Sequence, residues 1–375
     1  MLSPKYLESL PVGLVSIYAD LESWIIADIA RRIAGADYVM TPSAEWQIKK
    51  TQEMRLSYDE VVKKVARQTG KTQKEIRRIF EEAGVKALEN DSKIYALAGK
   101  DPTAFMNSLA LNRTFIAGIE QTNGLMKNFT KSLAAQSNKL LGDLLDQAYF
   151  EVQSGAWSYQ TAVKKAVRQL ARQGVQTVKF GSGHTDQVDV AVRRAVITGV
   201  NITSARLQIE LADEMECDLV ETSSHAGSRP QHREWEAQIF SRSGKHPKYP
   251  DFVSNTRYGF ADGLCGINCR HSFFPYFEGI SKPVEIQVSA KENEEYYNLT
   301  QQQRAYERKI RKQKRQVEAL KGALNGCKDD TLRVELENEK KRSQAKLRET
   351  QSKLKAFCEE NDLARRRERE SIVKK

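Results

Sequence analysis

The chain has 375 residues, 40% of them apolar and 29% charged, with a formal net charge of +11. This length allows two or three domains with their own cores, and the positive charge favours a polyanionic neighbour. Five cysteines in a chain of this length exclude a disulfide framework, so we expect a reducing compartment. The N-terminus lacks a signal-peptide pattern and no stretch approaches 18 uncharged apolar residues, so we expect no membrane span.

The N-terminal part of the chain has the pattern of a helical scaffold. An apolar side chain at every fourth position predicts a helix over 14–34, and Gly35 provides its end. Thr41 and Pro42 supply an N-cap and a first-turn proline for a second helix that runs to about Leu56.

Residues 57–84 predict a helical hairpin. Capping-box patterns begin at Ser57 and at Thr72, and Gly70 lies between them, so we expect a tight turn near Gly70. The same outline fits a DNA-binding helix-turn-helix. The second helix has as many acidic as basic side chains, which favours a plain hairpin.

Residues 102–174 predict two or three further helices without a motif for chemistry. The glycine-rich segment Lys179–His184 lacks the spacing of a Walker or dinucleotide-binding loop, which favours a linker or a hairpin over a phosphate site. A helix over 186–212 follows, with valines on one face. Its Arg193 and Arg194 are interpreted as a solvated face or as an anchor for the next segment.

Chemically capable side chains gather between Cys217 and Pro275, where short strands and glycine-rich loops predict a small α+β domain. Cysteine sulfur and histidine nitrogen are preferred ligands of zinc. The candidate ligands are Cys265, Cys269, His225, His232 and His271. Two other interpretations compete with zinc: a catalytic Cys/His pair, and a structural set of buried cysteines and hydrogen-bonded histidines. The structural interpretation is favoured, because the Cys-x3-Cys spacing is looser than the usual zinc pattern and no oxyanion loop is evident.

From Glu292 onward, charged residues and glutamine dominate and predict two helices. Apolar residues in the first helix follow a/d spacing, with Gln313 as the polar exception, which predicts an antiparallel coiled-coil-like hairpin. Gly322 and Asn325–Gly326 are expected to interrupt this helix. Near the end, a basic cluster fits either contact with a phosphate backbone or a solvated helix end. The cluster contains Arg365, Arg366 and Arg367.

The order of motifs between His225 and Pro275 resembles that of the minor capsid proteins of tailed phages of Gram-positive bacteria, and more distantly that of Mu-type head-morphogenesis proteins. The resemblance covers about residues 1–280. The matching residues include His225, Arg229, Pro230, His232, Trp235, Tyr258, Cys265, Cys269, Arg270, His271 and Pro275. Arg229, Pro230 and Arg270 are expected to belong to the structural centre of this domain.

This resemblance implies a structural protein of the phage head, made in the host bacterial cytoplasm and located in the virion. It implies partnership with the portal and other head proteins, a role in head assembly, DNA packaging or DNA delivery, and no catalytic residues. The alternatives are a zinc-dependent hydrolase or nuclease, or a non-specific DNA-binding module. We expect no membrane partner and no cofactor other than zinc. A homo-oligomer is compatible with this role.

The expected fold is α+β and predominantly helical. A helical scaffold over 1–175 precedes a helix plus a small α+β head-morphogenesis-like domain over 176–280. A charged helical hairpin over 281–375 completes the chain.

Overall fold

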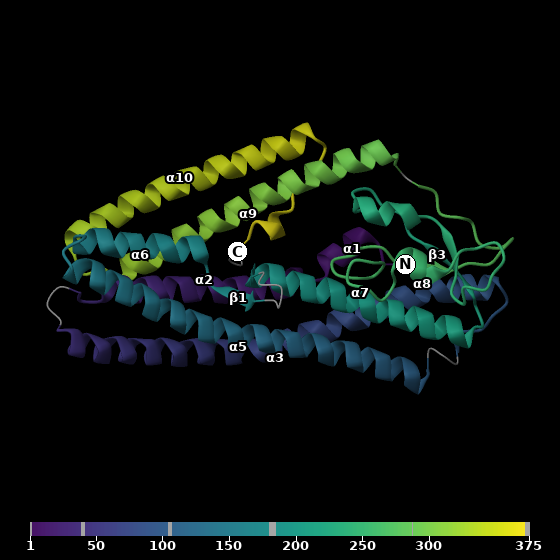
Figure 1. The fold of residues 1–375 in the computed structure, drawn as a ribbon, viewed down its shortest axis with the longest axis horizontal. Helices are drawn as coiled ribbons and strands as arrows, with labels where there is room; N and C mark the ends of the chain where they lie inside the picture. The colour runs from purple at the N-terminus through teal and green to yellow at the C-terminus, as the bar shows by residue number, and fades with distance from the viewer. Residues whose placement is uncertain (1, 39–41, 104–106, 180–184, 287, 372–375) are drawn as a thin grey trace. The chain divides into compact units, whose positions relative to one another are not determined.

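A computed structural model describes residues 2–38, 42–103, 107–179, 185–286 and 288–371 (Figure 1). The fold is predominantly helical α+β, as expected. Its helices are α1 (Pro4–Ser9), α2 (Val12–Gly35), α3 (Ser43–Leu97), α5 (Leu109–Gln153), α6 (Tyr159–Gln173), α7 (Val188–Glu214), α8 (Phe252–Thr256), α9 (Ala290–Gly326) and α10 (Asp330–Glu360), with short 3-10 helices η1 (Pro230–Trp235) and η2 (Arg367–Arg369). Its strands are β1 (Gln176–Lys179), β2 (Thr185–Gln187), β3 (Leu219–Thr222), β4 (Ile239–Ser241) and β5 (Phe273–Pro275).

The chain divides into two compact units, each assembled from three stretches of sequence. Unit 1 comprises Met1–Leu14, Thr72–Leu125 and Val192–Gln301, and unit 2 comprises Val15–Lys71, Met126–Ala191 and Gln302–Lys375. Every junction between the two units falls inside a helix, namely α2, α3, α5, α7 or α9. The sequence predicts consecutive segments with boundaries at 175 and 280. The two units are defined by spatial contacts instead, so those boundaries stay a prediction.

Unit 2 is a bundle of helices around one hydrophobic core. The core draws residues from six helices, including Ile25, Trp46, Leu141, Leu170, Leu320 and Leu336, all at most 2% exposed. The indole of Trp46 stacks on Tyr149 with ring centroids 4.6 Å apart. The expected stripe of α2 is therefore the inner face of this bundle, and α2 ends at Gly35 as predicted.

The apolar stretch Pro4–Gly35 is long and apolar enough to cross a membrane by length and composition alone, contrary to our expectation that no stretch qualifies. Core helices of globular proteins pass the same test. In unit 2 its Ile25, Ile29 and Ile33 are fully buried in the core. Its Arg32 is also buried there and pairs with three carboxylates, from Asp28, Glu53 and Glu60.

The predicted hairpin at 57–84 is wrong, because α3 runs without interruption from Ser43 to Leu97. The capping residue Ser57 instead donates its hydroxyl to Asp28 Oδ2 at 3.1 Å. Gly70 has open space around the position that a Cβ would take. A glycine inside a helix costs only about 1 kcal/mol, which a long packed helix tolerates.

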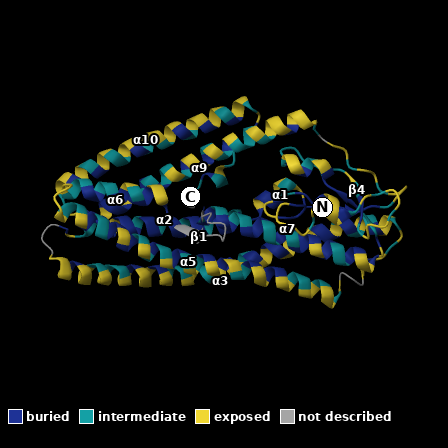
Figure 2. Cartoon of the chain, viewed as in Figure 1, coloured by how far each residue is buried: buried dark blue, intermediate teal, exposed yellow. Residues whose placement is uncertain are grey.

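The C-terminal hairpin is present as predicted: α9 and α10 run antiparallel (Figure 1). Gln313 Nε2 donates to Thr350 Oγ1 at 3.0 Å, and Gln303 Nε2 to Cys358 Sγ at 3.5 Å, so the contacts move toward the end of α10 as they move toward the start of α9. Buried and exposed residues alternate along α10 (Figure 2). Thr350 thus supplies the partner for the polar residue in the predicted seam.

Gly322 does not interrupt α9, contrary to expectation, because this helix continues to Gly326. A Cβ at Gly322 would overlap the carbonyl oxygen of Ala27 in α2, and a Cβ at Gly326 would overlap that of Arg31. The two glycines therefore allow the backbones of α9 and α2 to approach closely within unit 2.

Unit 1 contains a three-stranded antiparallel sheet in the order β4-β3-β5. Val220 pairs with Phe240 on one side and with Pro275 on the other. The sheet shares a core with α7 and the following loops, in which Val220, Trp235, Phe240, Phe252 and Phe273 are buried. The predicted small α+β region is thus formed. The predicted glycine-rich linker at 180–184 lies outside the described residues, although its flanking strands β1 and β2 pair antiparallel.

Asp91 in α3 is a buried carboxyl of unit 1, only 1% exposed. Gln208 in α7 donates from Nε2 to Asp91 Oδ2 at 2.8 Å and to the Phe273 carbonyl at 2.7 Å. Burial raises the pKa of Asp91 to about 7, although the hydrogen bond from Gln208 opposes the shift. The folded pKa lies above the unfolded one, so stability from this group is full below about pH 4 and is lost as pH rises toward 7.

We therefore expect Asp91→Asn to raise the free energy of unfolding by about 2 kcal/mol at pH 8 and to have little effect at pH 4. Urea unfolding of both proteins at the two pH values measures the difference. The exposed Asp59→Asn is the control for removing a carboxylate from the surface of the same helix. A gain for Asp91→Asn that does not depend on pH would contradict the assignment.

Candidate metal centre

Two loops of unit 1 carry the candidate site, one around η1 and the other leading into β5. Pro230 begins η1, as its fixed φ favours, and places His232 in the buried face of this short helix. Arg229 Nη2 donates to the Ile267 carbonyl at 2.8 Å and so ties the first loop to the second. The expected structural role of Arg229 and Pro230 is consistent with these positions.

The second loop, which contains Cys265 to His271, is a tight, irregular turn that is hydrogen-bonded to α7. Cys265 and Asn268 adopt left-handed backbone conformations, with φ of 59° and 56°. Asn201 in α7 donates its side-chain amide to the carbonyls of Cys269 and His271, at 3.1 and 3.2 Å. These bonds fix the backbone on both sides of Arg270 and set the directions of the side chains of Cys269 and His271.

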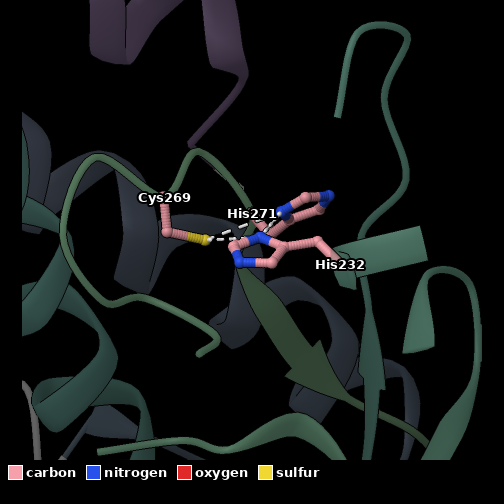
Figure 3. Close-up of side chains that lie close together, drawn as sticks. All are labelled: His232, Cys269 and His271. Atoms are coloured by element: carbon pink, nitrogen blue, oxygen red, sulfur yellow. Dashed lines mark hydrogen bonds between the residues drawn. The ribbon is translucent and has the colours of Figure 1, made fainter. Parts of the chain in front are cut away.

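Three potential ligand atoms converge between the loops (Figure 3). His232 Nδ1 lies 3.4 Å from His271 Nδ1. Cys269 Sγ lies 3.8 Å from His232 Nδ1 and 3.5 Å from His271 Nδ1. The three side chains therefore form a compact triangle of two nitrogens and one sulfur.

The far nitrogen of each ring has its own acceptor. His232 Nε2 lies 2.8 Å from the Asp262 carbonyl, and His271 Nε2 lies 2.6 Å from Glu236 Oε1. A carbonyl or carboxylate oxygen accepts only, so each Nε2 carries the hydrogen. Each neutral ring therefore turns an unprotonated Nδ1 toward the centre of the triangle.

The site is closed to solvent. His232, Cys269 and His271 are 3%, 2% and 1% exposed. Burial lowers the pKa of both histidines and raises the pKa of the Cys269 thiol. Burial also raises the pKa of Glu236, but the interaction with His271 and the hydrogen bonds from the His225 backbone and from Ser228 together outweigh it and leave this pKa below its usual range. The contact between His271 and Glu236 is thus a hydrogen bond from a neutral ring to a carboxylate.

The other candidates from the sequence lie beside the triangle rather than in it. The ring of His225 stacks on His271 with centroids 4.3 Å apart, and its Nδ1 lies 3.0 Å from the Ala226 carbonyl. Burial lowers the pKa of His225 to about 4. Cys265 is buried with its Sγ 3.6 Å from the His271 carbonyl. Arg270 turns away and pairs with the buried Glu8 of α1 at 2.6 Å.

Sequence reasoning did not identify Glu236, Asn201 or the Asp262 carbonyl as parts of this site. Glu236 follows η1 and lies four residues after His232, a spacing that also occurs in ordinary surface helices. Asn201 comes from the middle of α7, far along the chain from the loops that it holds. Only the folded backbone brings these groups together.

The predicted basic cluster lies near the C-terminus, in unit 2, whereas the Cys/His site lies in unit 1. Arg365 forms a two-bond pair with Glu370, with both distances 2.7 Å. Arg366 is half-buried, and Arg367 is exposed. Contact between these arginines and nucleic acid stays a prediction, and the ion pair already engages one of the three.

The fold is mostly helical, and its cluster of ligand-type side chains is buried. The comparisons with known proteins define the protein further. A model of the family described as Phage minor capsid protein 2 matches residues 2–359, and the chain belongs to this family. The resemblance expected from the sequence is thereby confirmed, and it reaches residue 359 rather than ending near residue 280. The protein is a structural component of the virion.

Two relatives have the same character. A protein named "Structural protein" from Lactococcus phage LL-H is 22% identical over 340 residues, covering 87% of this chain and 88% of the relative. A second "Structural protein", from Lactococcus phage mv4, is 34% identical over 131 residues, covering 34% of this chain and 95% of the relative. No solved structure matches the chain.

Proposed function

We propose that this protein acts as a minor structural component beside the portal of the phage head, in head assembly and in DNA packaging or delivery. One observation carries the proposal: the family match runs through residues 2–359, which include most of both units and the α9–α10 hairpin. The molecule as a whole is therefore of the minor capsid type. A capsid segment attached to an unrelated enzyme would match over only part of its length.

The burial of the Cys/His site adds support. Catalytic zinc sites keep one coordination position open to water and substrate. The three ligand-type side chains here are 1–3% exposed, which favours a structural over a hydrolytic role. The alternative of a zinc-dependent hydrolase or nuclease thus has less support than the structural role.

Co-expression with the portal protein of the same phage tests the proposal. We expect the full chain to co-purify with tagged portal and not with tagged major capsid protein at equal expression. Mass measurement of the complex gives the copy number and tests for a homo-oligomer. Failure to bind portal, together with its absence from purified DNA-filled heads, would overturn the proposal.

Contact with packaged DNA is a second part of the proposal, supported by the net charge of +11. Because Arg365 is paired with Glu370, we expect few phosphate contacts and a shallow salt dependence, with a slope of log K against log salt of about −1 to −3. Fluorescence anisotropy with two duplexes of unrelated sequence measures it. A tenfold preference for one duplex would indicate base-specific recognition instead.

A further inference from the structure

We propose that His232, Cys269 and His271 bind one zinc ion, through Nδ1, Sγ and Nδ1, in a structural centre that joins the η1 loop to the loop before β5. The inference concerns unit 1 alone and does not depend on the partner of the protein in the head. It is carried by the spacing of the ligand atoms, by the tautomers of the histidines and by the hydrogen bonds around them.

The spacing fits tetrahedral zinc. Bond lengths of about 2.05 Å to nitrogen and about 2.3 Å to sulfur give tetrahedral edges of about 3.3 Å between two nitrogens and about 3.6 Å between nitrogen and sulfur. The observed separations are 3.4 Å for the nitrogen pair and 3.5 and 3.8 Å for the nitrogen–sulfur pairs. The triangle therefore already has the dimensions of one face of a zinc tetrahedron.

The tautomers give a second argument. With both Nε2 atoms donating outward, His232 Nδ1 and His271 Nδ1 face each other as two acceptors. The Cys269 thiol has one hydrogen and can satisfy only one of them. A buried acceptor without a donor costs about 1–3 kcal/mol, whereas a cation at the centre satisfies both nitrogens at once.

The surrounding hydrogen bonds are those that support metal-bound histidine. Such ligands usually donate their other ring nitrogen to a carboxylate or a backbone carbonyl, which fixes the tautomer and the ring orientation. His271 donates to Glu236, and His232 donates to the Asp262 carbonyl. Both support types thus occur within one site.

A second group of nearby residues does not make a metal site. His225, Glu236 and His271 also place potential ligand atoms close together. However, Glu236 Oε1 and His271 Nε2 are only 2.6 Å apart, the length of a hydrogen bond and well below the roughly 3.3 Å edge expected between two zinc ligands. The distance assigns this side of His271 to the carboxylate and the Nδ1 side to the metal.

Three protein ligands leave a fourth position on the metal, for which Cys265 and an enclosed water are the two candidates. Cys265 is the other buried thiol of the same loop, and its Sγ contacts the His271 carbonyl. Cobalt substitution distinguishes the two, because thiolate-to-cobalt absorption rises with the number of bound thiolates. An absorption that falls by half in Cys265→Ser identifies Cys265, and an unchanged absorption identifies water.

Elemental analysis of the full chain, expressed in zinc-containing medium and desalted, is the direct test. We expect about one zinc per chain in the wild type and in Cys217→Ser, a control that removes another buried thiol of unit 1. Cys269→Ser and His232→Ala should each lose at least nine-tenths of the metal. Equal zinc in Cys269→Ser and the wild type would show adventitious binding and overturn the proposal.

A measurement on the unmodified protein covers the case in which variants fail to fold. We expect a strong chelator to lower the melting temperature by about 10 °C, and zinc, but not magnesium, to restore it. A wild-type chain that purifies without zinc and whose melting temperature does not respond to added zinc would also overturn the proposal.

Discussion

Replacing Gly322 by alanine is expected to lower the free energy of unfolding by about 3 kcal/mol, although alanine normally favours a helix over glycine. The added methyl group would overlap the Ala27 carbonyl oxygen of α2. This obstacle is backbone, so no side-chain rotation relieves the overlap, and the two helices must separate or the core must repack. Urea unfolding monitored by circular dichroism measures the loss.

Gly70→Ala is the matched control for this prediction. Gly70 is also inside a helix, but nothing lies within 4 Å of its added Cβ. We expect this variant to gain about 0.5–1 kcal/mol from helix propensity alone. Destabilisation by Gly70→Ala would contradict a continuous α3 and would favour the turn that the sequence suggested. A neutral Gly322→Ala would show that α9 and α2 pack less closely than described.

Replacing Glu236 by alanine is the second change with a large expected effect. Its Oε1 accepts from His271 Nε2 at 2.6 Å and from the His225 backbone N–H at 3.3 Å, and both donors would remain in the interior without an acceptor. We expect a loss of about 3 kcal/mol in unfolding free energy. If the centre binds zinc, Glu236 is a positioning residue, and metal affinity should also fall about 10–100-fold.

Glu236→Gln separates the hydrogen bonds from the charge. Its side-chain oxygen can accept from both donors, so we expect it to retain more than half of the stability lost in the alanine variant. Thermal unfolding at pH 7 compares the three proteins, and a competing chelator compares their zinc affinities. Equal losses in the two variants would show that the negative charge, rather than hydrogen bonding, stabilises this site.

Local patterns predicted the elements that depend on local chemistry. The four-residue apolar stripe identified α2, and short strand-like segments between Cys217 and Pro275 predicted the small α+β region. The concentration of cysteine and histidine pointed to the segment in which the fold brings His232, Cys269 and His271 together. The α9–α10 hairpin was predicted from the a/d spacing of its apolar residues and from the turn signal at Asn325–Gly326.

The rest depended on contacts that sequence does not display. The capping box at Ser57 was misleading because Asp28, a residue of another helix, engages its hydroxyl. Gly322 suggested a break in the helix, because glycine is a poor helix former. Its actual role, the close approach to the Ala27 carbonyl of α2, cannot be seen in the sequence. The choice of Cys269 over Cys265 for the triangle depends on left-handed turns, and Glu236 became part of the site only through the fold.

The interleaved composition of the two units has a consequence for biosynthesis. Unit 1 needs residues from Met1–Leu14 and from the stretch that ends at Gln301, and unit 2 needs residues beyond Gln302. Domains usually fold in turn as they leave the ribosome. Here neither unit can be completed until most of the chain has been translated, so helices with exposed apolar faces must wait for distant partners. Folding and assembly into the head should therefore follow translation rather than accompany it.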